Sequence, residues 1–361
     1  MKERWSNIVL FCCMLTMVAC SSNDDEPEQN GIMTRQATVT YLVTPNGLGD
    51  NGYNDNAAEG IFAFAQETGT RLRLLLPSNE TEAEQMYKQW LKDNAENDSA
   101  VIILGSSAYE RMARQTSNLK SEISNQKGCR VLLFESDEEI EGISTVIISR
   151  YGISYLAGAM SQNFDALILA ATKGVPALEE AIAGFQDARK EYAGAYNGIS
   201  CQTTLSYLAE GEEGFAMPDS AYRFMAQRAD EAFFYDEIIF PLLGGSEAGV
   251  LRFLNDSEYM MALMIGMDTD QAGLSTRIPF SMVIRIGDVL KQYLNDWLDG
   301  REWPAHQCIG MKDGAADIVI TPRFNDFLNI TDERYSDPNT FQCLYERFKD
   351  EAIRKEEEYG K

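Results

Sequence analysis

The segment that decides the fold is residues 38–60, TVTYLVTPNGLGDNGYNDNAAEG, because three patterns follow one another in it. Residues 38–43 are β-branched, aromatic or aliphatic and predict a buried strand. The Asn and Gly residues between Asn46 and Gly52 predict a tight turn. Helical spacing then runs from Tyr53 to Thr68. A strand, a glycine-rich turn and a helix in this order predict the first unit of a parallel sheet with crossover helices.

The same alternation continues through most of the chain. Further strands of a first set are expected at Arg71–Leu76, Ala100–Leu104, Arg130–Phe134 and Thr145–Ile148, with helices at Glu80–Asn94 and Ser107–Asn125. After a helix at Ser154–Gln162, a second set has strands at Ala166–Ala171, Ile238–Leu243 and Met261–Met267, and helices at Pro176–Tyr192, Ser220–Ala229 and Glu247–Leu254. Each helical stretch is long enough to close a βαβ unit.

Two sets of βα units predict an α/β protein with two Rossmann-like lobes, as the chain length also favours. We expect lobe 1 at 37–148 and lobe 2 at 149–271. A helix at Ser281–Leu298 and a strand at Asp317–Thr321 remain, so we expect part of about 272–310 to return to lobe 1 and about 311–330 to return to lobe 2. The last residues, 331–361, predict a charged helix on the outside.

The N-terminus has the pattern of an export signal. Lys2 and Arg4 precede an apolar run, Ile8–Ala19, which is too short for the roughly 20 residues of a membrane span. The run ends at Cys20 in a stretch that resembles a bacterial lipobox. We therefore expect a signal peptide at 1–19, a lipid on Cys20 and a flexible tether at 20–36. The protein would be lipid-anchored to the cell envelope.

The sequence of the tether does not decide which side of the envelope the protein faces. Residues 21–28, SSNDDEPE, are polar and acidic and cannot bury enough apolar surface to order themselves. Such a run resembles the surface-export signal of Bacteroidetes lipoproteins, and it is equally typical of a solvated spacer. Both the periplasmic face and the outer-membrane surface stay open.

Charge excludes several kinds of partner. The formal net charge is −25, spread along the chain, which repels nucleic acid and anionic lipid headgroups. We expect no nucleic-acid partner and membrane contact only through the lipid anchor. The cysteines beyond Cys20, Cys129, Cys201, Cys308 and Cys343, fit no zinc or C-x-x-C redox spacing, and either disulfides or buried reduced thiols are compatible with their positions.

Few residues suit catalysis or metal binding. His306, the only histidine, follows a helix in a predicted loop with no nucleophile nearby in sequence. Asp268 and Asp270 offer too few oxygen ligands for a hard cation. We expect no enzyme activity, no metal and no cofactor.

The loop after the first strand has a specific residue order. Asp50, Tyr53, Asn54 and the Glu59-Gly60 pair resemble the first signature of the basic membrane protein family of substrate-binding lipoproteins, which includes purine-nucleoside receptors. Gly52 stands where that family has Ser.

Further elements of that family resemble this chain in the same order. They are Ala100–Gly105, Arg130–Glu135, Tyr155–Gly158, Gly184-Phe185, Ile239–Gly245 with Gly249, Ile265–Gln271 and Ser281–Val283. The ordered set implies the type I periplasmic-binding-protein architecture, in which two lobes are joined by a three-strand hinge around a ligand cleft. It also implies delivery of a solute to the permease of an ABC transporter.

The resemblance, together with the rule that ligands collect beyond the carboxyl ends of parallel strands, gives a candidate site. Its expected residues are Asp50, Tyr53, Asn54, Gly105, Ser106, Glu135, Asp137, Gly244, Gly245, Asp268 and Arg285. Glu135 and Asp137 are alternatives for the family's acid after the fourth strand. Asn54 is equally suited to capping a helix.

Departures from the family bear on the ligand. Ile284 stands in the place of the family's Lys, with Arg285 beside it as a possible substitute, and Ile148 replaces a Phe. Carboxylates without that amine favour an uncharged ligand, so we expect a nucleoside-like or polyol solute and weak binding of phosphorylated nucleotides. The alternative is a surface lipoprotein that uses the fold to bind carbohydrate or protein without transport.

Overall fold

The computed structural model describes residues 37–115, 129–192, 201–231, 237–256, 262–322 and 340–359. Contacts within the chain separate Met1–Arg35 from a body, Gln36–Lys361. All the helices and strands that the structure describes belong to this body. The expected signal peptide, Cys20 and the tether lie outside the described residues. Within the described ranges, no helix is both long enough and apolar enough to cross a membrane.

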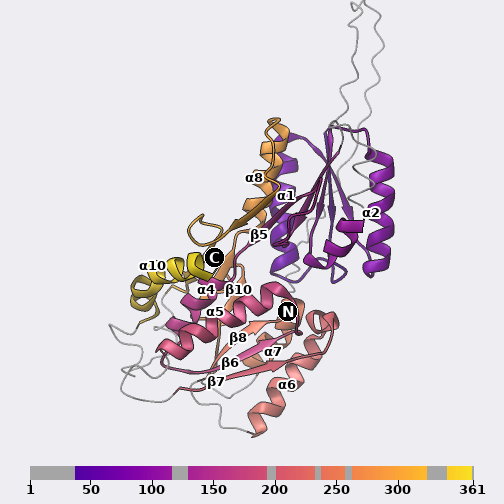
Figure 1. Ribbon diagram of the computed structural model, residues 1–361. Coiled ribbons are helices and arrows are strands. Elements are labelled where there is room, and N and C mark those ends of the chain that lie inside the picture. The colour runs from indigo at the N-terminus through magenta and orange to yellow at the C-terminus, as the bar shows by residue number, and fades with distance from the viewer. Residues whose placement is uncertain are drawn as a thin grey trace, which may run out of the picture. The chain divides into compact units, whose positions relative to one another are not determined.

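The first lobe is built on a six-stranded parallel sheet with the order β12-β5-β4-β3-β1-β2 (Figure 1). The strands are β1 Thr38–Leu42, β2 Arg71–Leu75, β3 Ala100–Leu104, β4 Arg130–Phe134, β5 Ser144–Ile148 and β12 His306–Ile309. Helices α1 (Tyr53–Thr68) and α8 (Ile286–Leu298) cover one face, and α2 (Glu80–Asn94) covers the other.

Side chains of β1 alternate between these two faces, as expected for a strand buried on both sides. Val39 and Tyr41 belong to the core that includes Phe64 of α1. Leu42 belongs to a second core beneath α2, where the Trp90 indole N–H donates to the Thr40 hydroxyl at 2.9 Å. The sheet is therefore fixed in place from both faces, and its strand ends are rigid supports for loops.

The second lobe is built on a four-stranded parallel sheet with the order β7-β6-β8-β9. The strands are β6 Asp165–Ala170, β7 Thr203–Tyr207, β8 Glu237–Leu242 and β9 Leu263–Met264. The helices are α4 Tyr151–Met160, α5 Pro176–Tyr192, α6 Pro218–Glu231 and α7 Glu247–Asp256. Helices α4 and α5 approach closely, because a Cβ on Gly184 would lie 2.3 Å from the carbonyl oxygen of Tyr151.

A three-stranded sheet, β10-β11-β13, completes the described body. Its strands are β10 Gly266–Asp268, β11 Phe280–Ile284 and β13 Ala316–Ile320; β11 pairs parallel with β10 and antiparallel with β13. Helix α10, Phe341–Tyr359, packs on α4 and β13. Within the described residues the chain passes between the lobes after β5, between β11 and α8, and between β12 and β13.

This architecture confirms the α/β fold with two lobes of parallel strands that the sequence predicts. Three strands were not predicted: β7, β11 and β12. Residues 281–284 of the expected helix Ser281–Leu298 instead belong to β11, a nearly continuous buried run, and the helix α8 begins only at Ile286. Strand β7 is half-exposed and β12 is exposed or half-exposed, so neither has an apolar run. His306 consequently begins a strand, and the expectation of a loop there is wrong. Helix α4 begins at Tyr151 instead of Ser154, and Ser107–Tyr109 forms a 3₁₀ turn before a helix at 110–115. The proposed lobe boundaries remain predictions.

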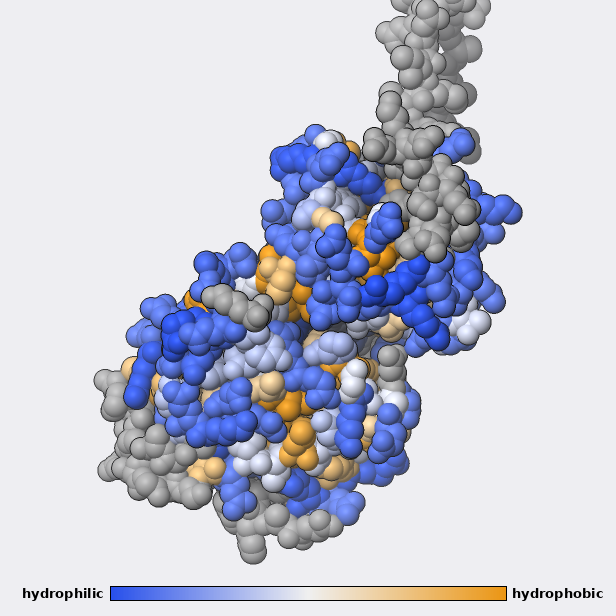
Figure 2. Space-filling view, in the orientation of Figure 1, coloured by the Kyte–Doolittle hydropathy of each residue, from blue (hydrophilic) through white to orange (hydrophobic). Residues whose placement is uncertain are grey.

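The surface agrees with the high charge. On the face that Figure 2 shows, hydrophilic residues dominate and hydrophobic residues form small separate patches. The exposed large hydrophobic side chains include Leu76, 55% exposed, and Tyr359, 51% exposed. Isolated apolar side chains of this kind are normal on a protein surface.

Candidate ligand-binding site

A cavity of about 400 Å³ lies at the ends of strands from all three sheets. Of the residues that the sequence predicts for the site, its walls include Asp50, Tyr53, Asn54, Ser106, Glu135, Gly244, Gly245 and Asp268. A cavity of this size is within the range of small-molecule sites. The rule that ligands collect beyond the strand ends therefore brings most of the predicted residues together.

Three predicted residues lie apart from the walls. Gly105 contributes through its backbone, since its carbonyl oxygen accepts a hydrogen bond from the Tyr53 hydroxyl at 3.1 Å. Asp137 is exposed, so Glu135 is the acid of the fourth strand that faces the cavity. Arg285 is also exposed, and it pairs with Asp288 of its own helix at 3.9 Å.

The Asp50 carboxylate binds backbone N–H groups at the start of helix α1. Its carboxylate oxygens accept hydrogen bonds from the backbone N–H groups of Gly52, Asn54 and Asp55, at 3.1, 2.9 and 3.2 Å. The Asn54 side-chain amide donates to the same carboxylate at 3.0 Å and accepts from the Thr44 hydroxyl at 3.1 Å. These N–H groups have no partner within the helix, so Asp50 and Asn54 have a structural role at its first turn.

Tyr53, the first residue of α1, places a neutral aromatic ring in the wall. Its ring lies 5.8 Å from that of Phe134, between ring centres, in a tilted arrangement. Burial, aided by the negative charge of Glu135, raises the pKa of the Tyr53 hydroxyl well above its ordinary value. The side chain therefore offers an apolar face with a fixed, protonated phenol.

Glu135 and Asp268 share an unusual backbone conformation. Their φ angles are +66° and +62°, in the left-handed region that side chains other than Gly rarely adopt. Glu135 directly follows β4, and Asp268 is the last residue of β10. Such strain costs about 1–3 kcal/mol per residue and gathers at functional sites. The conformation turns both carboxylates out of their strands at the cavity wall.

Arg150, which the sequence analysis missed, is the cation of the cavity wall. Its side chain is 8% exposed, and its guanidinium donates to the Glu135 carboxylate at 3.0 Å and to the Ile148 carbonyl at 2.7 Å. Burial acts to lower the pKa of Arg150, but the charges of Glu135 and Asp268 outweigh it and raise that pKa. Arg150 follows β5 closely, so the strand-end rule could have found it.

The two strained carboxylates differ in their partners. Burial raises the pKa of Glu135 to about 6, although the charge of Arg150 opposes this. Burial also raises the pKa of Asp268 to about 6, with Arg150 opposing and Asp50 contributing. No described residue donates a hydrogen bond to the Asp268 carboxylate. Because Asp268 is half-buried at the cavity wall, its carboxylate can accept hydrogen bonds from water or from a ligand.

Much of the remaining wall is apolar. It is formed by Val175, Ala177, Leu178, Ala181, Phe215, Pro241, Leu242, Leu243, Met267, Met282 and Ile284. Ile284, which stands in the place of the family's Lys, is fully buried. Because Arg285 points to solvent, it does not replace that amine in this conformation. Individual apolar residues carry no sequence signal that separates a cavity wall from a core.

No family model matches the chain. Among solved structures, a solute-binding protein of an ABC transporter system from Aeropyrum pernix K1 is similar with a TM-score of 0.67 and 16% identity, over 89% of this chain and 90% of that one. An ABC transporter solute-binding protein from Burkholderia graminis C4D1M, in complex with D-arabinose, has a TM-score of 0.56 and 15% identity, over 82% and 98%. A transcriptional activator of the comK gene from Bacillus halodurans has a TM-score of 0.58 and 17% identity, over 84% and 98%. At these identities the likeness shows the two-lobed periplasmic-binding-protein fold alone.

Proposed function

We propose that this protein is an extracytoplasmic solute-binding protein that holds a small uncharged solute in the cavity between its lobes. The observation that carries the proposal is the Asp268 carboxylate, which lies half-buried at the cavity wall on a strained backbone and accepts no hydrogen bond from a described residue. Keeping such a group costs stability, and a ligand donor at that position would offset the cost.

The cavity chemistry favours an amphipathic ring compound. The wall contains five carboxyl groups and the single guanidinium of Arg150; the acidic residues are Asp50, Glu80, Glu135, Glu213 and Asp268. An anion would meet net repulsion, whereas hydroxyl or ring N–H groups can donate to carboxylates. Tyr53 and Phe215 offer faces for a flat or partly apolar ring. A nucleoside combines these features, and a polyol has the hydroxyl groups alone.

We propose delivery to an ABC transporter as the consequence of binding. Support comes from the two solute-binding proteins named above, which share the fold over most of their length. Closure of the lobes around the solute would complete its hydrogen bonds and exclude water. We assign no catalytic step to the cavity, and turnover of a bound solute would overturn this assignment.

We also propose a lipid anchor at Cys20, on the strength of the lipobox-like sequence. Metabolic labelling with an alkyne fatty acid should mark the wild-type protein and leave Cys20→Ala unlabelled. Protease treatment of intact cells then separates the two faces of the envelope. Cleavage of the body in intact cells would favour the surface lipoprotein that captures carbohydrate or protein, and protection would favour the periplasmic receptor.

A thermal-shift screen tests the binding proposal directly. The compounds are adenosine, inosine, guanosine, their monophosphates, D-arabinose and amino acids, each against wild-type protein and Asp268→Asn. We expect a neutral nucleoside or polyol to raise the Tm of the wild type by several degrees, since saturating ligand stabilises the folded state. The shift should shrink in Asp268→Asn. A screen in which no solute stabilises the protein, or in which a monophosphate is the best ligand, would contradict the proposal.

A further inference from the structure

The C-terminal helix inserts one carboxylate between two glycines. Glu356 of α10 accepts a hydrogen bond from the backbone N–H of Met311 at 2.9 Å. A Cβ on Gly152 would lie 2.7 Å from the Glu356 Cβ, and a Cβ on Gly310 would lie 2.2 Å from a Glu356 carboxylate oxygen. No larger residue fits at either position without displacing the carboxylate, so the two glycines form its slot.

The slot lies where the chain passes between the lobes. Gly152 is in the first turn of α4, just after β5, and Gly310 directly follows β12. The two passages are also joined to each other, because the Ser149 N–H donates to the Ile309 carbonyl at 2.7 Å. Glu356 therefore contacts two of the three interlobe passages at a point where they run together.

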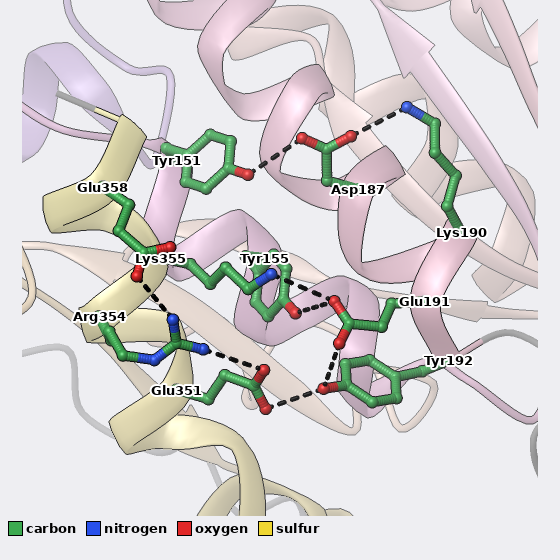
Figure 3. A network of polar contacts seen from close by, with 10 residues as sticks. All are labelled: Tyr151, Tyr155, Asp187, Lys190, Glu191, Tyr192, Glu351, Arg354, Lys355 and Glu358. Carbon is green, nitrogen blue, oxygen red and sulfur yellow. Dashed lines mark hydrogen bonds and ion pairs between the residues drawn. The ribbon is translucent and has the colours of Figure 1, made fainter. Parts of the chain in front are cut away.

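Helix α10, which carries Glu356, is fastened to the second lobe by other side chains, which Figure 3 shows. The Tyr192 hydroxyl of α5 donates to Glu351 at 2.8 Å, and Lys355 of α10 pairs with Glu191 of α5 at 3.3 Å. The rings of Tyr359 and Tyr151 stack at 4.0 Å, which fastens α10 to α4. A movement of the first lobe against the second would therefore move Gly310 relative to the Glu356 side chain.

The groups that face Glu356 are mostly acidic. They are Glu180 of α5, which accepts from the Ser149 hydroxyl at 2.6 Å, Asp313, which accepts from the Gly310 N–H at 3.0 Å, and Cys308 of β12. The neighbouring cations Arg354, Lys355 and Lys312 pair with other carboxylates, and no described cation pairs with Glu356. The carboxyl group is thus buried beside like charge.

Burial decides the balance at this carboxyl group. It raises the pKa of Glu356 to about 7, with Glu180 contributing, although the Met311 N–H acts in the opposite direction. Since the pKa is raised, burial and like charge outweigh the stronger hydrogen bond that an ionised carboxylate would accept. Ionisation of Glu356 in the slot therefore costs more free energy than ionisation of an exposed Glu.

We propose that Glu356 is a positioning residue for the hinge: its neutral carboxyl group holds residues 149–152 and 310–311 together, and its ionisation loosens both passages. Arg150 reaches the cavity from the first of these segments, so the looseness would be transmitted to the guanidinium that pairs with Glu135. This last consequence rests on the proposed function, whereas the hold on the two passages does not.

Hydrogen exchange of the full chain, corrected for the intrinsic pH dependence of amides, tests the proposal without any ligand. In the wild type, the amides of Met311 and of residues 149–152 should exchange about tenfold faster at pH 8.5 than at pH 6. Glu356→Gln keeps the shape and cannot ionise, so its protection should be the same at both values. Glu358→Gln, an exposed position on the same helix that pairs with Arg354, is the matched control and should behave as the wild type.

Each result of the hydrogen-exchange experiment either supports the proposal or overturns it. A wild-type pH dependence that persists in Glu356→Gln, or no pH dependence in the wild type, would overturn the proposal. Glu356→Ala should lose the protection at both pH values, and if that variant does not fold, the Gln variant still decides. Because no solute is involved, a failed solute screen would count against the proposed function and leave this result standing.

Discussion

Asp50 and Asp268 both line the cavity, and the difference between them separates a structural carboxylate from a candidate binding group. Asp50 accepts hydrogen bonds from the backbone of Gly52, Asn54 and Asp55. Asp268 accepts none from a described residue and has a left-handed backbone. An acceptor that is already satisfied contributes to folding, whereas a half-buried acceptor without a donor from the described residues is available to a ligand.

Glu135 is a third case between these two. It shares the strained backbone of Asp268, but the Arg150 guanidinium satisfies it at 3.0 Å. The pair is buried, so neither charge is stabilised by water. We therefore expect mutation of each of the three carboxylates to change stability and binding in a different way.

The largest effect is expected at the buried pair. Arg150→Met should lower the free energy of unfolding at pH 8 by about 3–5 kcal/mol, because it leaves the Glu135 charge buried without a partner. Urea unfolding measures this. The double variant Arg150→Met with Glu135→Gln should recover part of the loss, since it removes both charges. A loss below about 1 kcal/mol in the single variant would show that Glu135 has another partner.

Asp268→Asn should lower affinity without lowering stability. Losing one hydrogen bond to a charged acceptor costs about 1.5–3 kcal/mol, roughly a 10- to 100-fold rise in the Kd of the best solute of the screen. Unfolding at pH 8 should show equal or greater stability, because the variant removes a charge that is partly shielded from water. Calorimetric titration gives the Kd, with the exposed Asp270→Asn as control. Unchanged affinity in Asp268→Asn would remove Asp268 from the site.

Most of the architecture could be predicted from the sequence, because buried parallel strands such as Ala100–Leu104 are continuous apolar runs. The edge strands β7 and β12 were not predicted, because their side chains are half-exposed or exposed and form no apolar run. Site residues were found where they follow a strand, as Glu135 and Asp268 do. The sequence cannot separate Asp50 from Asp268, since hydrogen-bond satisfaction depends on where neighbouring N–H groups lie in space. The sequence likewise cannot separate Arg285 from Arg150, because only the fold decides which guanidinium is buried.

Binding and stability should respond to pH in opposite directions. The pKa of Asp268 is raised to about 6, so the folded, unliganded protein retains a proton that the unfolded chain releases. Its stability should therefore fall as pH rises from about 4 to 6. A ligand that donates to the ionised carboxylate should bind up to about tenfold more weakly for each pH unit below 6. Titrations between pH 5 and 8 test this. Most of the pH dependence of binding should vanish in Asp268→Asn, whereas the pH dependence of stability should only shrink, because Glu135 also has a raised pKa. A pH dependence of binding that stays unchanged would point to Glu135 instead.

Asp50→Ala should have the reverse signature of Asp268→Asn. It removes the acceptor for the first N–H groups of α1, which costs about 1 kcal/mol of stability, as loss of a helix cap does. The Kd of the same solute should change less than about threefold. Chemical unfolding and calorimetry are measured side by side, and Asp50→Asn, which keeps one acceptor oxygen, should be intermediate. A large loss of affinity with unchanged stability would make Asp50 a ligand contact after all.

The smallest effect is expected at Arg285. Its side chain is 45% exposed, and its pair with Asp288 at 3.9 Å lies in water, where such pairs contribute about 0–1 kcal/mol. Arg285→Gln should therefore change neither the free energy of unfolding nor the Kd beyond error, although the residue stands beside the position where the resembled family has its Lys. Arg150→Lys is the informative partner, because it keeps a charge in the cavity wall and loses the planar guanidinium that holds Glu135. If Arg285→Gln weakened binding while Arg150→Lys did not, the cation that serves the solute would be Arg285, and the helix that carries it would have to turn toward the cavity when the solute binds.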